Sequence, residues 1–196
     1  LSNRTYGHNI VRPFLFGLLP DSQEQRRAIA AEYDVASNNP VALLRHIGLD
    51  CAGAVQFCQT DQLDAIRGRV SEYRPLSNSQ IAHKLKAIRD DESETWMGSN
   101  ESWSLGGNQG KFALAWHGDQ WCECLGSSPT THIFKNGVVG FKHQALNEFV
   151  CMKTAQRVGI PTANVSYCIF EDEVALVVER YDRTVNASGS IERLHQ

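Results

Sequence analysis

The sequence lacks the cysteine spacing of a zinc site. Its 196 residues include six cysteines, at positions 51, 58, 122, 124, 151 and 168, and no two of them form a C-x-x-C pair. Most of them lie in apolar runs, such as 150–152 and 167–169, where we expect buried thiols that act as small hydrophobic side chains. Unpaired thiols in this number are typical of proteins kept in a reducing cytosol.

Long apolar runs and a secretory signal are also missing from the sequence. No stretch approaches the roughly 20 apolar residues that a membrane-spanning helix needs, and the start lacks the basic and apolar regions of a signal peptide. We therefore expect a cytoplasmic protein with no membrane contact. Residue 1 is Leu rather than Met, which is compatible with a fragment or a processed piece.

An excess of positive charge is absent as well. The chain has 19 Lys and Arg residues against 22 Asp and Glu residues, which gives a formal net charge of -3. Broad nucleic-acid binding depends on basic side chains that neutralise phosphates, so this chain alone is not expected to bind nucleic acid in that way.

The first hundred residues indicate short helices. Ser22, followed by Glu24, is typical of a helix N-cap and predicts a helix that runs to about Tyr33. Pro40 suits the first position of a second helix, which ends near Gly48. Residues 51–57 are small and apolar and predict a strand instead.

The stretch from 59 to 75 is polar, and we interpret it as a connection with one edge strand. Ser77 and Gln80 have the spacing of a capping box, and Ile81, Leu85 and Ile88 follow at helical spacing. A charged run, 90–94, ends this amphipathic helix. The Gly, Ser and Asn residues that follow predict a boundary near residue 100, between a mostly helical subdomain with a linker, 1–100, and a second subdomain, 101–196.

The second half predicts an α+β unit with an antiparallel sheet and one main helix. Short runs rich in β-formers are separated by Gly, Asp, Ser or Pro, and one amphipathic segment stops at Gly159. The charged residues 171–173 are typical of a hairpin turn. The predicted strands are 111–116, 121–125, 131–135, 165–170 and 174–181, and the predicted helix is 143–158.

A glycine-rich segment, SLGGNQGK at 104–111, is the first candidate for binding chemistry. Glycines allow the backbone to approach a ligand closely, and successive amides can then surround an anion. The formal nucleotide motifs are absent, since a Walker loop would need glycine at Leu105 and there is no G-x-G-x-x-G. The segment alone is equally typical of a hairpin turn.

Two further patterns lie downstream. Lys135 ends a predicted strand and Glu148 lies in the next helix, which is the arrangement that orients a phosphate-binding lysine in kinases. The strand 176–183, LVVERYDR, ends in charge, and its backbone near 179–181 could pair with a purine edge while Tyr181 supplies apolar surface. Taken separately, an exposed Lys and Glu, and an Arg-Asp-Arg cluster on the surface, are the simpler interpretations.

The order of these elements is that of a protein-kinase small lobe, and the segments together resemble the HipA family of bacterial kinase toxins. The resemblance lies in SLGGNQGK, PTTHIFK at 129–135, NEFVCM at 147–152, GIP at 159–161 and LVVERYDR. Upstream, FGLLP at 16–20 and GLDCAGAVQF at 48–57 resemble the N-terminal subdomain of that family.

The resemblance implies ATP and Mg²⁺ as cofactors, a HipB-like antitoxin dimer as partner, operator DNA contacted through that complex, and a protein substrate such as glutamyl-tRNA synthetase. It also implies autophosphorylation at Ser104. The ATP-binding residues that it implies are Gly106, Gly107, Asn108, Gln109, Gly110 and Lys111 in the loop, Lys135 with Glu148, and Glu179, Arg180 and Tyr181 in the hinge.

The chain departs from the family by lacking the large helical lobe. In the family, the catalytic Asp and the magnesium ligands lie downstream of the segment matched by residues 193–196, and no HRD or DFG motif occurs here. We therefore expect no catalytic or metal-binding residue in this chain and no turnover by it alone. Two alternatives stay open: a catalytically inert kinase-fold binding or regulatory module, and an enzyme independent of nucleotide that uses Cys122, Cys124 or His132.

Overall fold

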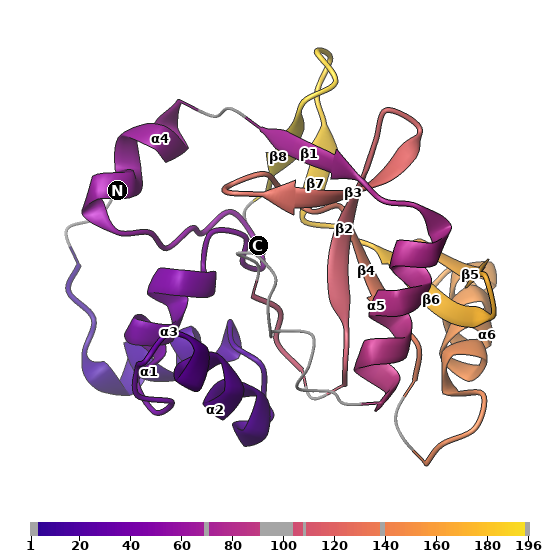
Figure 1. The fold of residues 1–196 in the computed structure, drawn as a ribbon, viewed down its shortest axis with the longest axis horizontal. Coiled ribbons are helices and arrows are strands. Elements are labelled where there is room, and N and C mark those ends of the chain that lie inside the picture. Colours follow the sequence, from indigo (N-terminus) through magenta and orange to yellow (C-terminus); the bar gives the residue numbers. More distant parts are fainter. Residues whose placement is uncertain (1–3, 69–70, 91–103, 108, 138–139, 195–196) are drawn as a thin grey trace.

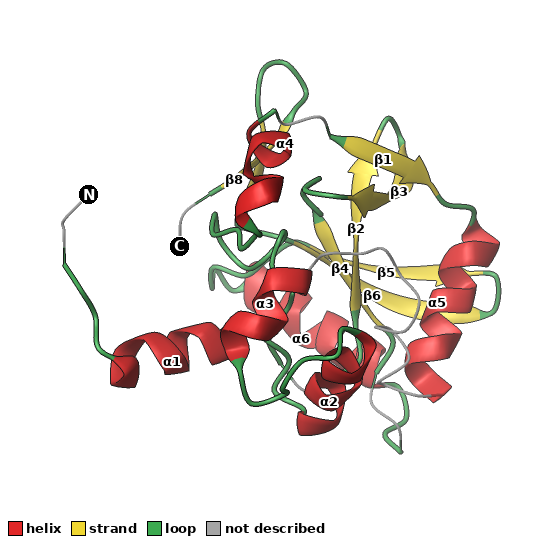
Figure 2. Cartoon of the chain, turned by 60° about the vertical axis from the view of Figure 1, so that its left-hand side comes forward, coloured by secondary structure: helices red, strands yellow, loops and turns green. Residues whose placement is uncertain are grey.

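The computed structural model describes residues 4–68, 71–90, 104–107, 109–137 and 140–194. A group of N-terminal helices lies beside a sheet that carries two further helices, and a small hairpin, β7 and β8, lies above them (Figure 1). Figure 2 shows the same arrangement from the side of the N-terminal helices. The chain therefore mixes helices with an antiparallel sheet, as the sequence predicts.

The N-terminal group consists of α1 (His8–Gly17), α2 (Gln23–Glu32) and α3 (Pro40–Ile47). Helix α2 begins as predicted, because the Ser22 hydroxyl accepts a hydrogen bond from the amide of Gln25. Helix α3 has Pro40 in its first turn and an Asn39 cap whose side chain accepts from Ala42 N. Both predicted helices are confirmed.

The strand predicted at 51–57 is wrong. These residues form a turn and an irregular segment, in which Gly53 has a positive φ of 72°. The backbone groups of Cys51 and Gly53 bond to side chains from the other half of the molecule, and Phe57 N donates to Gly48 O. The amide of Gly53 donates to Asp182 Oδ2, and Cys51 O accepts from Arg180.

The polar connection contains a 3-10 turn, η1 (Thr60–Gln62), a short helix, α4 (Leu63–Arg67), and the strand β1 (Glu72–Pro75). The two helical turns were not predicted. Strand β1 lies at the edge of the sheet and pairs with β3, so the predicted edge strand is confirmed.

The main sheet is antiparallel and has the order β1-β3-β2-β4-β6-β5. Five strands confirm the predicted ones: β2 (Phe112–His117), β3 (Gln120–Leu125), β4 (His132–Lys135), β5 (Val165–Phe170) and β6 (Glu173–Glu179). Strands β5 and β6 form the predicted hairpin. Beyond β6, the short strands β7 (Arg183–Val185) and β8 (Ile191–Arg193) pair with each other.

Helices α5 (Asn78–Asp90) and α6 (Gln144–Arg157) cover opposite faces of this sheet. Val177 of β6 belongs to the core cluster that holds the apolar face of α5, whereas its neighbour Leu176 packs with Ala145 of α6. Successive strand residues point to opposite faces, so the two helices lie on either side. The predicted capping box of α5 is present, since Ser77 N donates to Gln80 Oε1 and Gln80 N donates to Ser77 Oγ.

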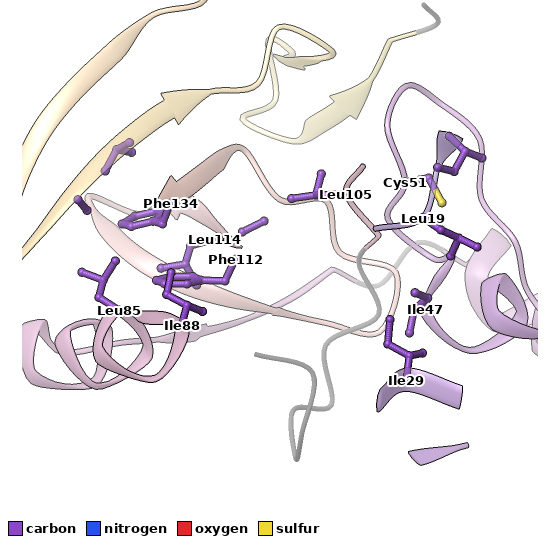
Figure 3. Packing of buried hydrophobic residues seen from close by; sticks show 14 of the residues in the cluster. Leu19, Ile29, Ile47, Cys51, Leu85, Ile88, Leu105, Phe112, Leu114 and Phe134 are labelled. Carbon is purple, nitrogen blue, oxygen red and sulfur yellow. The ribbon is translucent and has the colours of Figure 1, made fainter. Parts of the chain in front are cut away.

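The main core runs without interruption from the N-terminal helices to the sheet. Figure 3 shows Leu19, Ile29 and Ile47 at one end of it, Leu105 in the middle, and Leu85, Ile88 and Phe134 at the other. The boundary expected near residue 100 lies outside the described residues, but β1 and α5, from the first hundred residues, pack within the sheet unit. Residues 72–90 thus belong structurally with the second half.

The cysteines are less uniformly buried than the sequence suggests. Cys51, Cys122 and Cys124 are buried, Cys58 and Cys168 are half-buried, and Cys151 is exposed. The prediction of a buried thiol at Cys151 is wrong, because α6 packs only one face on the sheet and residue 151 lies on its outer face. All six are free thiols.

Candidate functional site

A cleft of about 470 Å³ lies where the glycine-rich segment, β4 and the end of β6 meet. Its polar lining includes Lys111, Lys135 and the backbone that follows β6. Its apolar lining comes from Ala52, Leu105, Ile133, Ala163 and Val178. This combination of apolar walls and a few convergent polar groups is typical of a small-molecule site.

The glycine-rich segment forms one wall of the cleft. Gly107 has a φ of 102°, a conformation that favours glycine, and a Cβ on Gly106 would lie 2.9 Å from the carbonyl oxygen of Gly17. Gln109 Nε2 is buried and has no hydrogen-bond partner within the described part of the chain. A buried donor without an acceptor is uncommon in folded proteins.

The lysine on β4 also lines the cleft. Lys135 pairs with Leu176 of β6 and therefore points to the sheet face that α6 covers. There its Nζ donates to Glu148 Oε1 at 2.8 Å, and both side chains are partly exposed. The predicted Lys–Glu pair is therefore present, and it holds the ammonium group of a residue that lines the cleft.

The end of β6 and the residues after it also line the cleft. Glu179, Arg180 and Tyr181 all line the cleft, and Tyr181 is 73% exposed. The amides of Glu179 and Arg180 already donate to Asn164 O and Thr131 O. At these two residues a ligand would therefore have to bond to groups other than the amides, such as the carbonyl oxygens.

The Arg-Asp-Arg cluster interpreted as a surface feature is buried. Arg180 and Asp182 are each 4% exposed, and Arg183 is 9% exposed. They surround Asp50, whose Oδ2 accepts from Arg180 Nη1 at 3.3 Å and whose Oδ1 accepts from Arg183 Nη2 at 2.8 Å. The surface interpretation was wrong because a partner 130 residues away in sequence neutralises these arginines.

Further contacts complete this ion cluster. Asp50 Oδ1 also accepts from Arg193 Nε at 3.0 Å, and its Oδ2 accepts from the hydroxyl and the amide of Thr130. Burial alone would raise the pKa of Asp50, but Arg180, Arg183 and Arg193 hold it below its ordinary value. The cluster therefore ties the segment around residue 50 to the wall of the cleft after β6.

The structure brings most of the predicted site residues together. Gly106, Gly107, Gln109, Lys111, Lys135 and residues 179–181 line one cleft. Glu148 reaches it through Lys135, Gly110 is buried beside it, and Asn108 lies outside the described residues. The sequence analysis missed Asp182 and the apolar lining, although Ile133, two residues before Lys135, could have been placed on the same strand face by its spacing.

Ser104 does not line the cleft. Its side chain is fully buried, its hydroxyl donates to Leu18 O at 2.6 Å, and its amide donates to Asp50 O at 3.0 Å. The hydroxyl is therefore reached by a phosphate donor only after the segment has moved.

The residues considered for a nucleotide-independent enzyme do not form a catalytic arrangement. Cys122 Sγ and Cys124 Sγ donate to backbone carbonyl groups, and burial raises the pKa of the Cys122 thiol. His132 contacts Trp121 edge to face, on the side of β4 away from Lys135, and burial lowers its pKa. This geometry offers no activated thiolate at these positions.

Comparisons with known proteins agree with the resemblance. The family model "HipA N-terminal domain" matches residues 1–58, and the model "HipA-like C-terminal domain" matches residues 103–196. The chain is 33% identical to "Putative kinase Y4mE" of Sinorhizobium fredii, with 94% of this chain and 44% of that protein covered. It is 31% identical to "Serine/threonine-protein kinase toxin HipA" of Shewanella oneidensis, with 89% and 39% covered.

A solved structure gives the same result. The complex of HipA, HipB and operator DNA from Shewanella oneidensis contains a chain that matches with a TM-score of 0.72 and 29% identity, over 94% of this chain and 42% of that one. The relatives are thus kinases by name, and the fold is similar to that of one of them. The chain belongs to the HipA family.

The chain spans less than half the length of the relatives that it matches. Within the described residues, no helix is long and apolar enough to cross a bilayer.

Proposed function

We propose that the chain is the ATP-binding part of a HipA-like serine/threonine kinase, with the architecture of a kinase small lobe. The observation that carries the proposal is the convergence of Lys135, the backbone at Gly107 and the segment 179–181 on one cleft. Kinases bind ATP with these three elements, namely a glycine-rich loop, a lysine held by a helix glutamate and a hinge.

In this proposal, different lining residues contact the phosphates and the base of ATP. Lys135, held by Glu148, binds phosphate oxygens. The apolar residues Ile133 and Val178 contact the base, whose edge meets the backbone near Glu179 and Tyr181. Bound ATP supplies the phosphoryl group for transfer.

Magnesium is not assigned to residues of this chain. Within the described residues, no group of three His, Cys, Asp or Glu side chains is gathered in one place, and Asp182 is engaged by arginines. The family resemblance implies that the metal ligands and the catalytic Asp belong to the large lobe. This chain by itself is therefore expected to bind ATP without transferring its phosphate.

The finer function is a proposal that rests on the family resemblance. We propose that the parent protein is a toxin that phosphorylates a serine of a protein substrate of the glutamyl-tRNA synthetase class. A HipB-like antitoxin dimer would neutralise it and hold it on operator DNA. A net charge of -3 is consistent with DNA contact through the partner and not through this chain.

Calorimetric titration of the chain with a non-hydrolysable ATP analogue tests the core of the proposal. We expect Lys135→Ala to weaken binding by about 10- to 100-fold, because a charge-assisted hydrogen bond contributes about 1.5–3 kcal/mol. Lys142→Ala, which removes an exposed lysine outside the cleft, is the matched control and should leave the affinity unchanged. Equal affinities for the two variants would refute the assignment.

A further inference from the structure

The glycine-rich loop is docked on the end of α1, in the N-terminal helical group. The Ser104 hydroxyl donates to Leu18 O, and Asp21 N donates to Gly107 O at 3.3 Å. Pro20 and Gly107 form an isolated β-bridge, and Gly106 lies so close to Gly17 O that a Cβ would be 2.9 Å away. The turn 17–21 therefore contacts the glycine-rich loop and supports it.

The path of this turn is fixed by Arg26 of α2. Its Nη1 donates to Pro20 O at 2.6 Å and to Asp21 O at 2.7 Å. The guanidinium group also lies over the Phe16 ring, 5.6 Å from its centroid. The last backbone carbonyl groups of a helix have no hydrogen-bond partners within the helix. Just beyond α1, the Ser104 side chain donates to Leu18 O, and the Arg26 side chain donates to Pro20 O and Asp21 O.

We propose that Arg26 is a positioning residue for nucleotide binding, which acts through the turn 17–21 on the glycine-rich loop. Arg26 does not line the cleft, so it would act on binding without contact with the nucleotide. A loop with three glycines in five residues loses much conformational entropy when it orders around a ligand. Contact with the turn 17–21 orders the loop before binding and so reduces that loss. The N-terminal helices thereby set the affinity of the cleft. This inference rests on the proposed function.

Hydrogen exchange without nucleotide tests the link between Arg26 and the loop. Arg26→Ala is expected to speed exchange of the 104–111 amides by about tenfold, while the amides of β4 and α6 keep their rates. Arg27→Ala is the matched control, because Arg27 is the exposed neighbour on the same helix. Unchanged exchange in the loop, or faster exchange throughout the molecule together with a lower melting temperature, would overturn the inference.

Titration with the same ATP analogue tests the consequence for binding. We expect Arg26→Ala to bind about tenfold more weakly and Arg27→Ala to bind like the unmodified chain. Arg26→Lys should restore most of the affinity, because an ammonium group can donate to both carbonyl oxygens. Wild-type affinity in Arg26→Ala would refute the role of Arg26.

The two measurements also separate this inference from the proposed function. If the unmodified chain binds no nucleotide, the proposed function fails and the role of Arg26 in binding fails with it. Fast exchange confined to the loop of Arg26→Ala, together with normal affinity of the analogue for that variant, would leave the proposed function intact and refute the positioning role.

Discussion

Replacing Asp50 by Asn is expected to destabilise the fold more than any exposed charge substitution. Its carboxylate accepts hydrogen bonds from Arg180, Arg183, Arg193 and both donors of Thr130, in a site where Asp50 is 2% exposed. The variant would leave three arginines with Asp182 as the remaining carboxylate of the cluster. An uncompensated buried charge costs about 3–5 kcal/mol.

The loss is large compared with the total stability of a domain, about 5–15 kcal/mol. With a urea dependence of about 2 kcal/mol per molar, the unfolding midpoint should fall by about 1.5–2.5 M. Urea unfolding followed by tryptophan fluorescence measures this shift. Asp172→Asn, in the exposed turn between β5 and β6, is the control and should change the free energy of unfolding by less than about 0.5 kcal/mol.

A second variant keeps the test informative if Asp50→Asn does not fold. Arg193→Met removes one donor at the more exposed rim of the cluster, where its side chain is 13% exposed, and leaves Arg180 and Arg183 in place. A smaller loss of about 1–3 kcal/mol is expected. An Asp50→Asn protein within about 1 kcal/mol of the unmodified chain would refute the view that this cluster joins the two parts of the fold.

Two further predictions concern pH and Ser104. Because the pKa values of Asp50 and Asp182 are lowered on folding, the stability they contribute is present above about pH 4 and is lost as the pH falls toward their folded-state pKa values. As the pH falls, the free energy of unfolding should therefore decrease less steeply for Asp50→Asn than for the unmodified chain. Equal pH dependence in the two proteins would contradict this. Ser104→Asp should weaken binding of the ATP analogue at least tenfold, because its charge meets the carbonyl end of α1, whereas Ser104→Ala should weaken it less. Calorimetry compares the two, and equal affinities would contradict the electrostatic reason.

The sequence predicts the elements of the fold well because their signals are local. Helix α2 begins at its Ser22 cap, α5 begins at its capping box, and the strands β2 to β6 follow runs of β-formers. The segment 51–57 fails for the same reason. Its small apolar residues resemble a strand, but the backbone groups of Cys51 and Gly53 bond to Arg180, Asp182 and Arg183, which lie about 130 positions away.

The candidate site also has a part that the sequence predicts and a part that it does not. The order of the glycine-rich loop, Lys135, Glu148 and the hinge can be read along the chain, and the structure gathers the first, second and last of them on one cleft. The burial of Arg180 could not be inferred, because an Arg-Asp-Arg run has the composition of a surface segment. Asp50 carries no local signal that it neutralises such a run.

Through these nonlocal contacts, the N-terminal segment that includes Asp50 becomes part of the proposed nucleotide site. The carboxylate of Asp50 binds Arg180 in the hinge, and its carbonyl oxygen accepts from Ser104 N at the head of the glycine-rich loop. Both walls of the cleft thus depend on one residue of the segment matched by the N-terminal family model. Because the turn 17–21 also supports the loop, a shift of the N-terminal helices would change both walls together, and nucleotide affinity should respond to that shift even without contact between those helices and the ligand.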